Sequence, residues 1–282
     1  MTQWAALPEE AAVFDFSGEV LRRQWGALHA GDRVPWPDES QVTAVLDLLP
    51  AASHPSGKAD QIAAKMQQAW RAFHAGDFAA AAAGAKALGV LAHAAANKAA
   101  CIYADHLEED EAAQQEIYRQ AAENATAALA ALPDDPNAHY FHALALGRYS
   151  QSISIAKALA QGLAGKVAAS LKRALEVAPD HADAHLAFGL YHAEIINKVG
   201  KLVGGMTYGA SEKEALTHLE RALELNGAAP IVHIEYGNAL YLLHGERGID
   251  DLNRAYRQAV TQAPRDAMEW LDQRYARAEL EE

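Results

Sequence analysis

The sequence is short of cysteine, because Cys101 is the only one among 282 residues. A single cysteine excludes an internal disulfide and any zinc site built from several cysteines, and it is typical of proteins in a reducing compartment. Aromatic residues are also scarce at 7%, although hydrophobic residues reach 51% and alanine is abundant. Alanine is the strongest helix former and lets helix axes approach closely, so this composition predicts closely packed helices.

A long hydrophobic run and the features of a secretory signal are also lacking. The most apolar stretch, residues 78–101, is alanine interrupted by two lysines and a histidine, which predicts a buried helix rather than a membrane span. Residues 1–20 carry acidic residues where a signal has basic and apolar segments. The formal net charge of −13 opposes binding to nucleic acid or to an anionic membrane. We therefore expect a soluble, cytoplasmic protein.

Motifs for catalysis are absent as well. The GLAGK segment at 162–166 is not followed by serine or threonine and does not follow a strand, so it is no nucleotide-binding loop. Cys101 lies on an alanine-rich helix, where we expect a buried structural thiol. Among the 13 histidines, His181 and His185 beside Asp183 form the best local cluster for a metal. Because histidines also follow the repeat pattern, we expect no metal, no cofactor and no enzyme.

A repeat of helical hairpins is present instead. Four expected helix starts have the same form, with His139 before Ala143, His185 before Gly189, His233 before Gly237, and Trp270 at the same position of the fourth. The tetratricopeptide pattern has Leu-Gly on its first helix and A-x3-F on its second. Phe188 and Gly189 match the former, and Ala215 and Leu219 match the latter. We predict an all-α fold, an α–α superhelix of the tetratricopeptide-like solenoid kind.

The first third of the chain repeats more loosely. QWGALHAGD at 24–32 returns as AWRAFHAGD at 69–77. The Gly-Asp-Phe stretch at 76–78 resembles the turn between the paired helices of a tetratricopeptide unit. We expect residues 1–57 to form a helical lead-in and residues 58–282 the regular array, packed together as one body.

Two successive repeats are longer than the standard period of about 34 residues. From His139 to His185 is 46 residues, and from His185 to His233 is 48. The excess lies in residues 145–167 and 191–211, after the first helix of each repeat. About twelve extra residues lengthen a continuous helix by about 18 Å. We therefore expect overlong helices in two repeats, projecting side by side as a shelf.

These extensions supply the candidate binding residues. The expected packed side of the first one follows helical spacing and consists of Tyr149, Ile153, Ala156, Ala160 and Leu163. Arg148 and Glu194 occupy the same phase of their repeats, so we expect them to face each other across a concave groove. The candidate partner- or ligand-binding residues are Tyr140, Arg148, Gln151, Glu194, Asn197, Lys198, Lys201 and Tyr208.

A resemblance to known families rests on AHYFHALALGRYSQSIS and the residues after it up to Gly200, followed by TYGASEKEALTHLERALELN at 207–226. This sequence resembles the tetratricopeptide-like part of the eukaryotic regulators of microtubule dynamics. It is also similar to the bacterial T-component associated with tripartite ATP-independent periplasmic transporters. The resemblance covers about residues 120–265 and implies a helical-repeat fold. Because the signal and lipid-accepting cysteine of T-components are missing, we expect a soluble bacterial relative.

The pattern and the resemblance lead to one main functional hypothesis and two others. The main one is a non-catalytic scaffold that binds a peptide or a partner protein through its concave groove and the shelf of extended helices. The alternative is a small-ligand-binding protein, in which the overlong helices enclose a pocket where Arg148 and Lys198 hold a carboxylate. A self-assembling structural protein, and hence a homo-oligomer, is the third.

Overall fold

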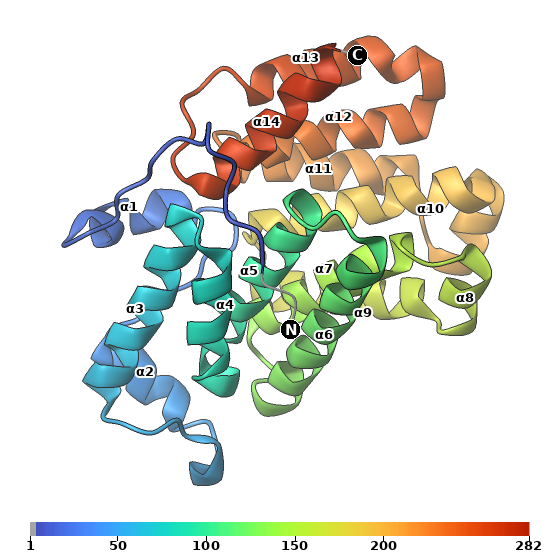
Figure 1. Ribbon diagram of the computed structural model, residues 1–282. Helices are drawn as coiled ribbons and strands as arrows, with labels where there is room; N and C mark the ends of the chain where they lie inside the picture. The colour runs from blue at the N-terminus through green and yellow to red at the C-terminus, as the bar shows by residue number, and fades with distance from the viewer. Residues whose placement is uncertain (1–3, 282) are drawn as a thin grey trace. The chain divides into compact units, whose positions relative to one another are not determined.

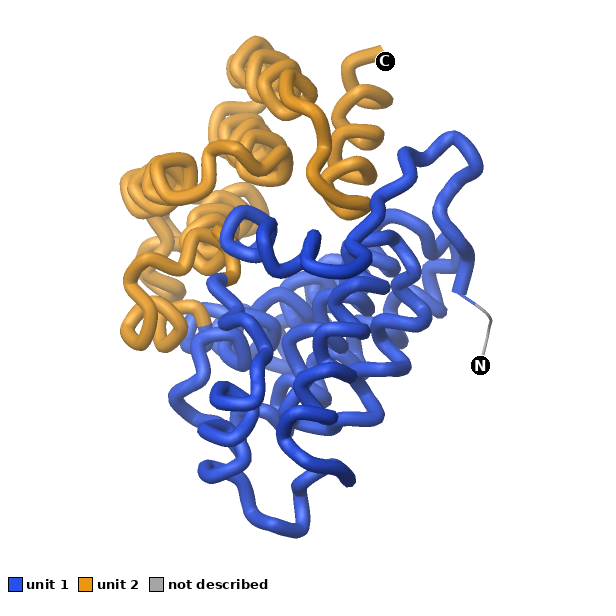
Figure 2. The backbone as a smooth tube through the Cα atoms, turned by 90° about the vertical axis from the view of Figure 1, so that its left-hand side faces the viewer, with its two compact units in different colours: residues 1–29, 33–170 blue, residues 30–32, 171–282 orange. Residues whose placement is uncertain are grey.

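The computed structural model describes residues 4–281, and these form helices and connecting turns with no strand in that range (Figure 1). The all-α fold class is confirmed. Contacts divide the chain into two compact units, coloured separately in Figure 2. Unit 1 comprises the residues up to His29 and Arg33–Ser170, and unit 2 comprises Ala30–Asp32 and Leu171–Glu282. This division does not fall at residue 57, and the expected lead-in and array stay a prediction.

In unit 1, helices that follow one another along the chain pack together from α2 to α7. Its elements are α1 (Val20–Leu28), α2 (Glu39–Leu46), a 3-10 turn (Ala51–Ser53), α3 (Ala59–Ala75), α4 (Phe78–Lys86), a 3-10 turn (Gly89–Ala92), α5 (His93–His106), α6 (Glu111–Ala131), α7 (Pro136–Gln151), α8 (Ile155–Ala160) and the first half of α9 (Leu163–Val177). Alanines occupy many of the buried positions on α4, α5 and α6, as close helix packing requires.

The turn between α3 and α4 follows from the Gly-Asp-Phe stretch. Gly76 ends α3 with φ of 92°, a left-handed conformation that glycine adopts without steric cost. The Asp77 carboxylate then accepts a hydrogen bond of 2.9 Å from the backbone N–H of Ala80 and caps α4. Phe78 follows as a buried side chain. These three residues form the turn between helices that their sequence predicts.

The scarce aromatic residues are concentrated in the core of unit 1. The two loosely repeated segments each carry a tryptophan followed four residues later by a histidine, and the structure brings the pairs together. Trp25 meets the edge of Trp70 with ring centroids 5.8 Å apart. The buried His29 and His74 lie with their Nε2 atoms 3.2 Å apart. The loose sequence repeat therefore reflects two helices that share one core.

In unit 2, α10 packs against α11 and α12, and α12 packs against α13 and α14 (Figure 1). The elements are α10 (Ala182–Tyr208), α11 (Glu212–Asn226), α12 (Pro230–His244), a 3-10 turn (Gly245–Gly248), α13 (Ile249–Ala259) and α14 (Ala267–Glu281), preceded by the second half of α9. Ala215, Leu219 and Ala222 of α11 are fully buried in the core. These are the positions at which the repeat pattern calls for close packing.

The phased histidines have a common structural role. Each donates Nε2–H to the backbone carbonyl six residues earlier: His139 to Pro133, His185 to Pro179 and His233 to Gly227, over 2.8, 2.9 and 2.8 Å. Each bond ties the first turns of a helix to the end of the preceding helix. The repeated contact explains the repeated histidine, so the three residues need no metal to account for them.

The first insertion does not form an overlong helix. α7 ends at Gln151, α8 is a separate six-residue helix, and Gly162 with φ of 62° interrupts the chain again before α9. Side-chain hydroxyls satisfy the backbone at the break, since Ser152 Oγ donates to the Tyr149 carbonyl at 2.9 Å and Ser154 Oγ caps α8. The prediction of a continuous helix here was wrong because serines compete with helical hydrogen bonds.

The expected packed side of this insertion was wrong in part for the same reason. Tyr149 and Ile153 are half-buried and Leu163 is buried, but Ala156 and Ala160 are exposed, because the breaks reset the helical phase. The second insertion does extend a helix. α10 is 27 residues long, with one non-helical residue, Gly200, at φ 80° and ψ 160°. An extended first helix is therefore confirmed in one repeat only, and it bends at a glycine.

Candidate functional site

The predicted binding residues fall in both units. Those on α7 of unit 1 are Tyr140, Arg148 and Gln151, and those on α10 of unit 2 are Glu194, Asn197, Lys198, Lys201 and Tyr208. Tyr140 is 9% exposed and lies against the Phe141 ring, with centroids 4.9 Å apart, so it offers little surface to a partner. The expected approach of Arg148 to Glu194 across a groove stays a prediction.

Arg148 is engaged inside unit 1. Its Nε lies 3.3 Å from Asp105 Oδ1, and both side chains are largely buried. The same carboxylate oxygen accepts a hydrogen bond of 2.5 Å from the hydroxyl of Tyr118. Burial, and then the charge of Asp105, raise the pKa of Tyr118, so this phenol remains a hydrogen-bond donor. Gln151 Oε1 is the acceptor for a long bond of 3.5 Å from Arg148 Nη1.

The lysines of α10 also have partners. Lys198 Nζ lies 2.9 Å from Glu194 Oε2, the pairing expected for charges four residues apart on one helix. Lys201 Nζ lies 2.5 Å from Glu212 Oε2, and His244 Nε2 lies 3.1 Å from the other oxygen of that carboxylate. The hydrogen bond from Lys201, and then that from His244, lower the pKa of Glu212. Exposed pairs of this kind are worth about 0–1 kcal/mol and exchange readily for a ligand's charge.

The structure also shows exposed apolar side chains in the insertions, which the sequence patterns did not reveal. α8 exposes Ile155 and Leu159, at 56% and 52%, and the end of α10 exposes Leu202, Val203 and Met206, at 75%, 50% and 81%. Among residues 4–281, these are five of the ten large hydrophobic residues that are exposed. Clusters of exposed apolar side chains mark interaction surfaces more often than single ones do.

Charge is distributed unevenly around the same residues. Residues 136–175 contain five lysines and arginines and no aspartate or glutamate, and residues 195–211 contain two lysines and no acidic residue. The whole chain has a net charge of −13, so these stretches are local exceptions. Counting acidic residues along the sequence could have found this signal. We call the exposed residues Ile155, Lys157 and Leu159 of α8, and Lys201, Leu202, Val203 and Met206 of α10, the insertion surfaces.

The histidine clusters do not form a metal site. Among residues 4–281, no three potential ligands are placed to hold an ion. His181 caps α10 by accepting a hydrogen bond of 3.1 Å from the backbone N–H of Ala184. His185, which donates to a carbonyl through Nε2, has its Nδ1 2.8 Å from Nδ1 of His218. His185 therefore accepts a hydrogen bond from His218 and contributes to packing.

The neighbouring His192 makes unit 2 sensitive to acid. It is 4% exposed, and burial, followed by the charge of His218, lowers its pKa to about 4. Its unfolded pKa is about 6.5, so the unfolded chain binds the proton more readily. The stability that neutral His192 contributes is therefore complete above pH 6.5 and is lost as pH falls towards 4. We expect this residue to account for about 1–2 kcal/mol of that loss, allowing for solvent screening.

Urea denaturation of the wild type and of His192→Phe at pH 7 and pH 4.5 measures this effect. The variant ring can pack against Phe188 as the imidazole does, at a centroid distance of 4.7 Å. We expect the free energy of unfolding to fall less in the variant than in the wild type on acidification. An equal fall in both proteins would show that His192 does not titrate in this way.

None of the described helices combines the length and apolar character needed to cross a membrane. Residues 58–231 match the family model described as regulator of microtubule dynamics protein 1-3, which covers more than half of the chain and begins where the regular array is expected to start. No curated protein matches the sequence closely enough to count as a relative. The similarity to T-components and to tetratricopeptide repeats stays a prediction. The matched residues show that the chain belongs to the regulator of microtubule dynamics family.

Proposed function

We propose that this protein is a non-catalytic helical scaffold in the cytoplasm, and that each of its two insertion surfaces, one in each unit, binds an acidic, partly apolar segment of a partner protein. The observation that carries the proposal is the coincidence of exposed apolar side chains with stretches that hold cations and no acidic residue. A helical protein-interaction role also fits a family named for the regulation of microtubule dynamics.

The apolar side chains supply the reason for association. Ile155 and Leu159 in unit 1, and Leu202 and Met206 in unit 2, are each at least half exposed to water in the free chain. Covering apolar surface is favourable by about 25 cal/mol for each Å² removed from water. Exposed in this way, these side chains add nothing to the stability of α8 or of the end of α10. A partner that covers them would account for their exposure.

The charges select the kind of partner. The chain as a whole is acidic, so its net charge repels an acidic segment, whereas the cationic stretches attract it. Such complementarity raises the rate of association and favours one orientation. Lys157 lies at the centre of α8 between the two exposed apolar residues, with its ammonium 5.8 Å from the Tyr149 ring centre.

The first insertion surface is held in place before binding. Gln115 Nε2 donates a hydrogen bond of 2.8 Å to the carbonyl of Ser152, which fixes the start of the α7–α8 turn to α6. The backbone N–H of Lys157 donates a hydrogen bond of 3.3 Å to Ser154 Oγ at the start of α8. A surface fixed in this way loses little conformational entropy when a partner docks.

The alternative function requires a pocket enclosed by two overlong helices. Only one of these helices is present, because α7 ends at Gln151. Arg148, which was expected to hold a carboxylate there, lies beside Asp105. A substitution of Arg148 therefore tests folding as much as binding. The exposed residues of the insertion surfaces give a cleaner test.

The proposal is tested by selecting peptides from a random display library on the immobilised full-length chain. We expect the enriched peptides to combine aspartate or glutamate with leucine, isoleucine or phenylalanine. Their affinity, measured by fluorescence anisotropy, is expected to weaken as salt is added, because exposed charges are screened. The double variant Leu159→Ser/Met206→Ser should bind the best peptide at least about tenfold more weakly, since tenfold corresponds to about 1.4 kcal/mol.

The matched control is Val13→Ser/Ile249→Ser, which removes two exposed apolar side chains at 96% and 43% exposure outside the insertions. It should bind the peptide as the wild type does. Enrichment of basic or uncharged peptides, or equal losses in both double variants, would contradict the proposal. So would a concentration-dependent dimer that disappears only in Leu159→Ser/Met206→Ser, because a second copy would then be the natural occupant.

A further inference from the structure

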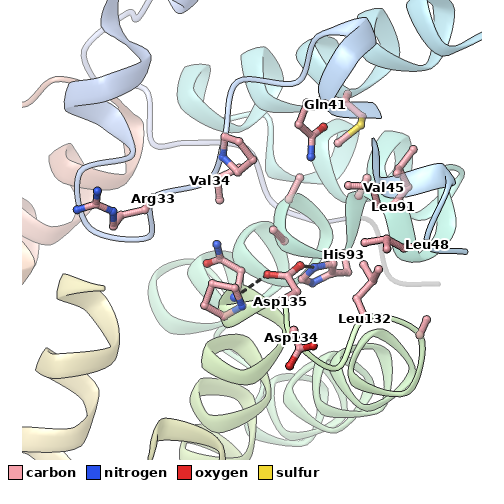
Figure 3. A pocket seen from close by; sticks show the side chains of 18 of the residues that line it. Arg33, Val34, Gln41, Val45, Leu48, Leu91, His93, Leu132, Asp134 and Asp135 are labelled. Atoms are coloured by element: carbon pink, nitrogen blue, oxygen red, sulfur yellow. Dashed lines mark hydrogen bonds and ion pairs between the residues drawn. The ribbon is translucent and has the colours of Figure 1, made fainter. Parts of the chain in front are cut away.

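A cavity of about 480 Å³ lies within unit 1, away from both insertions (Figure 3). One wall comes from residues 33–35 and α2, and the others come from α3, the start of α5 and the turn between α6 and α7. Its volume is in the range of about 300–1,000 Å³ that small-molecule sites occupy. The cavity is therefore large enough for a compact organic molecule.

The cavity walls are mostly apolar. Met66, Trp70, Leu91 and Leu132 line it and are themselves buried, so their positions are fixed by the core of the unit. Leu48 also lines it but is 70% exposed. A bound apolar molecule would cover this side chain, which otherwise faces water.

Two buried polar atoms in the lining have no hydrogen-bond partner among residues 4–281. They are Gln41 Oε1 on α2 and His93 Nδ1 at the start of α5. In Figure 3, Gln41 lies above the cavity and His93 lies below it beside Asp135. Buried polar atoms are almost always hydrogen-bonded in folded proteins, so two unpaired ones among the residues that line one cavity are where a bound molecule would form its hydrogen bonds.

His93 uses one of its two ring nitrogens in a contact with Asp135. Its Nε2 lies 2.7 Å from Asp135 Oδ2, and the other oxygen of that carboxylate accepts a hydrogen bond of 2.8 Å from the backbone N–H of Asn137. Burial alone would raise the pKa of Asp135, but the hydrogen bond and charge of His93 lower it overall. The carboxylate is therefore ionised and holds the proton of His93 on Nε2. The other ring nitrogen of His93, Nδ1, is the one without a partner.

We propose that this cavity binds an apolar small molecule, neutral or cationic, that carries an N–H or O–H donor. The molecule would donate to Gln41 Oε1 and form a hydrogen bond with His93 Nδ1, while its apolar part lies against Trp70 and Met66. An anionic group is disfavoured because the Asp135 carboxylate is part of the lining. The inference is independent of the partner-binding role, since it uses none of the residues of the insertion surfaces.

The family match does not by itself assign this cavity. Gln41, Val45 and Leu48 precede residue 58, where the matched region begins. They supply one wall and one of the two unpaired polar atoms. This chain therefore completes the cavity with a segment outside the matched residues.

Indole and 1-methylindole form a matched pair of probes, because they have similar shape and only indole has an N–H donor. We expect isothermal titration calorimetry on the full chain to show that indole binds at least tenfold more tightly than 1-methylindole. Indole should also move the ¹⁵N resonance of His93 Nδ1, which a purely apolar contact elsewhere would leave in place. Indole-3-carboxylate should bind more weakly than indole.

Two variants separate binding in the cavity from binding elsewhere. Val45 is a half-buried residue of the lining, so Val45→Trp fills the cavity with a large side chain and should abolish indole binding. Gln41→Met leaves room for indole but removes a polar atom, so it should weaken indole binding. Both should retain the circular dichroism spectrum and the peptide binding of the wild type. No binding of indole to the wild type, or equal binding of both probes that survives Val45→Trp, would overturn the proposal.

Discussion

The Gly189→Ala variant is expected to lose about 2 kcal/mol of stability, although alanine is the better helix former. A Cβ atom at residue 189 would lie 2.6 Å from Leu219 Cγ and 2.9 Å from the backbone oxygen of Ala215. The backbone oxygen belongs to α11 and cannot move without shifting that helix. Since Leu219 and Ala215 are fully buried, the strain has no outlet towards solvent.

The matched control for this substitution is Gly147→Ala in α7. A Cβ atom there meets nothing within 4 Å, and the residue is helical. We expect this variant to gain about 0.5–1 kcal/mol, because only the helix propensity changes. Urea denaturation followed by circular dichroism measures both. If the two variants changed stability in the same direction, the close approach of α10 and α11 at Gly189 would be refuted.

The Arg148→Ala variant is expected to lose about 1–3 kcal/mol of stability through an unpaired carboxylate. The Asp105 side chain is 16% exposed and accepts a hydrogen bond from Tyr118. Its negative charge is balanced by the guanidinium of Arg148, 3.3 Å away. Removing the guanidinium leaves this charge largely buried without its cationic partner. The effect is smaller than for a fully buried pair because Arg148 is 28% exposed.

A second substitution separates this structural role from a role in binding. The double variant Arg148→Ala/Asp105→Asn removes both charges, so we expect it to recover at least half of the lost free energy of unfolding. Peptide affinity should remain within about threefold of the wild type in the folded double variant, a difference of less than about 0.7 kcal/mol in binding free energy. A fully stable Arg148→Ala protein that no longer binds peptide would instead make Arg148 a binding residue.

The repeat pattern was sufficient to predict an all-α fold and the starts of several of its helices. Small residues and histidines at fixed spacing identified the starts of α7, α10 and α12, and the structure gives each histidine the same hydrogen bond. Those features are readable because they are local, each depending on a few neighbouring residues. The Gly-Asp-Phe turn between α3 and α4 is readable for the same reason.

The insertions were harder to interpret, because two structures compete for the same residues. Helical periodicity over 145–167 favours one long helix, whereas Ser152, Ser154 and Gly162 allow it to break. In α10, the chain continues as a helix on both sides of a single non-helical residue, Gly200. Which outcome occurs depends on contacts such as that from Gln115 to the carbonyl of Ser152, and sequence spacing does not reveal it.

By itself, the sequence determined an all-helical chain, the places where its repeated helices begin, and the positions of its charges, because these depend on local propensity and composition. The tertiary structure alone decided which charged residues are engaged, such as Arg148 with Asp105, and which apolar residues remain exposed, such as Met206. It also decided where a cavity forms, since residues 33–48 and 131–137 are far apart in the sequence and line the same space. Burial and long-range contact depend on how helices pack, and periodicity in one helix cannot specify its neighbours.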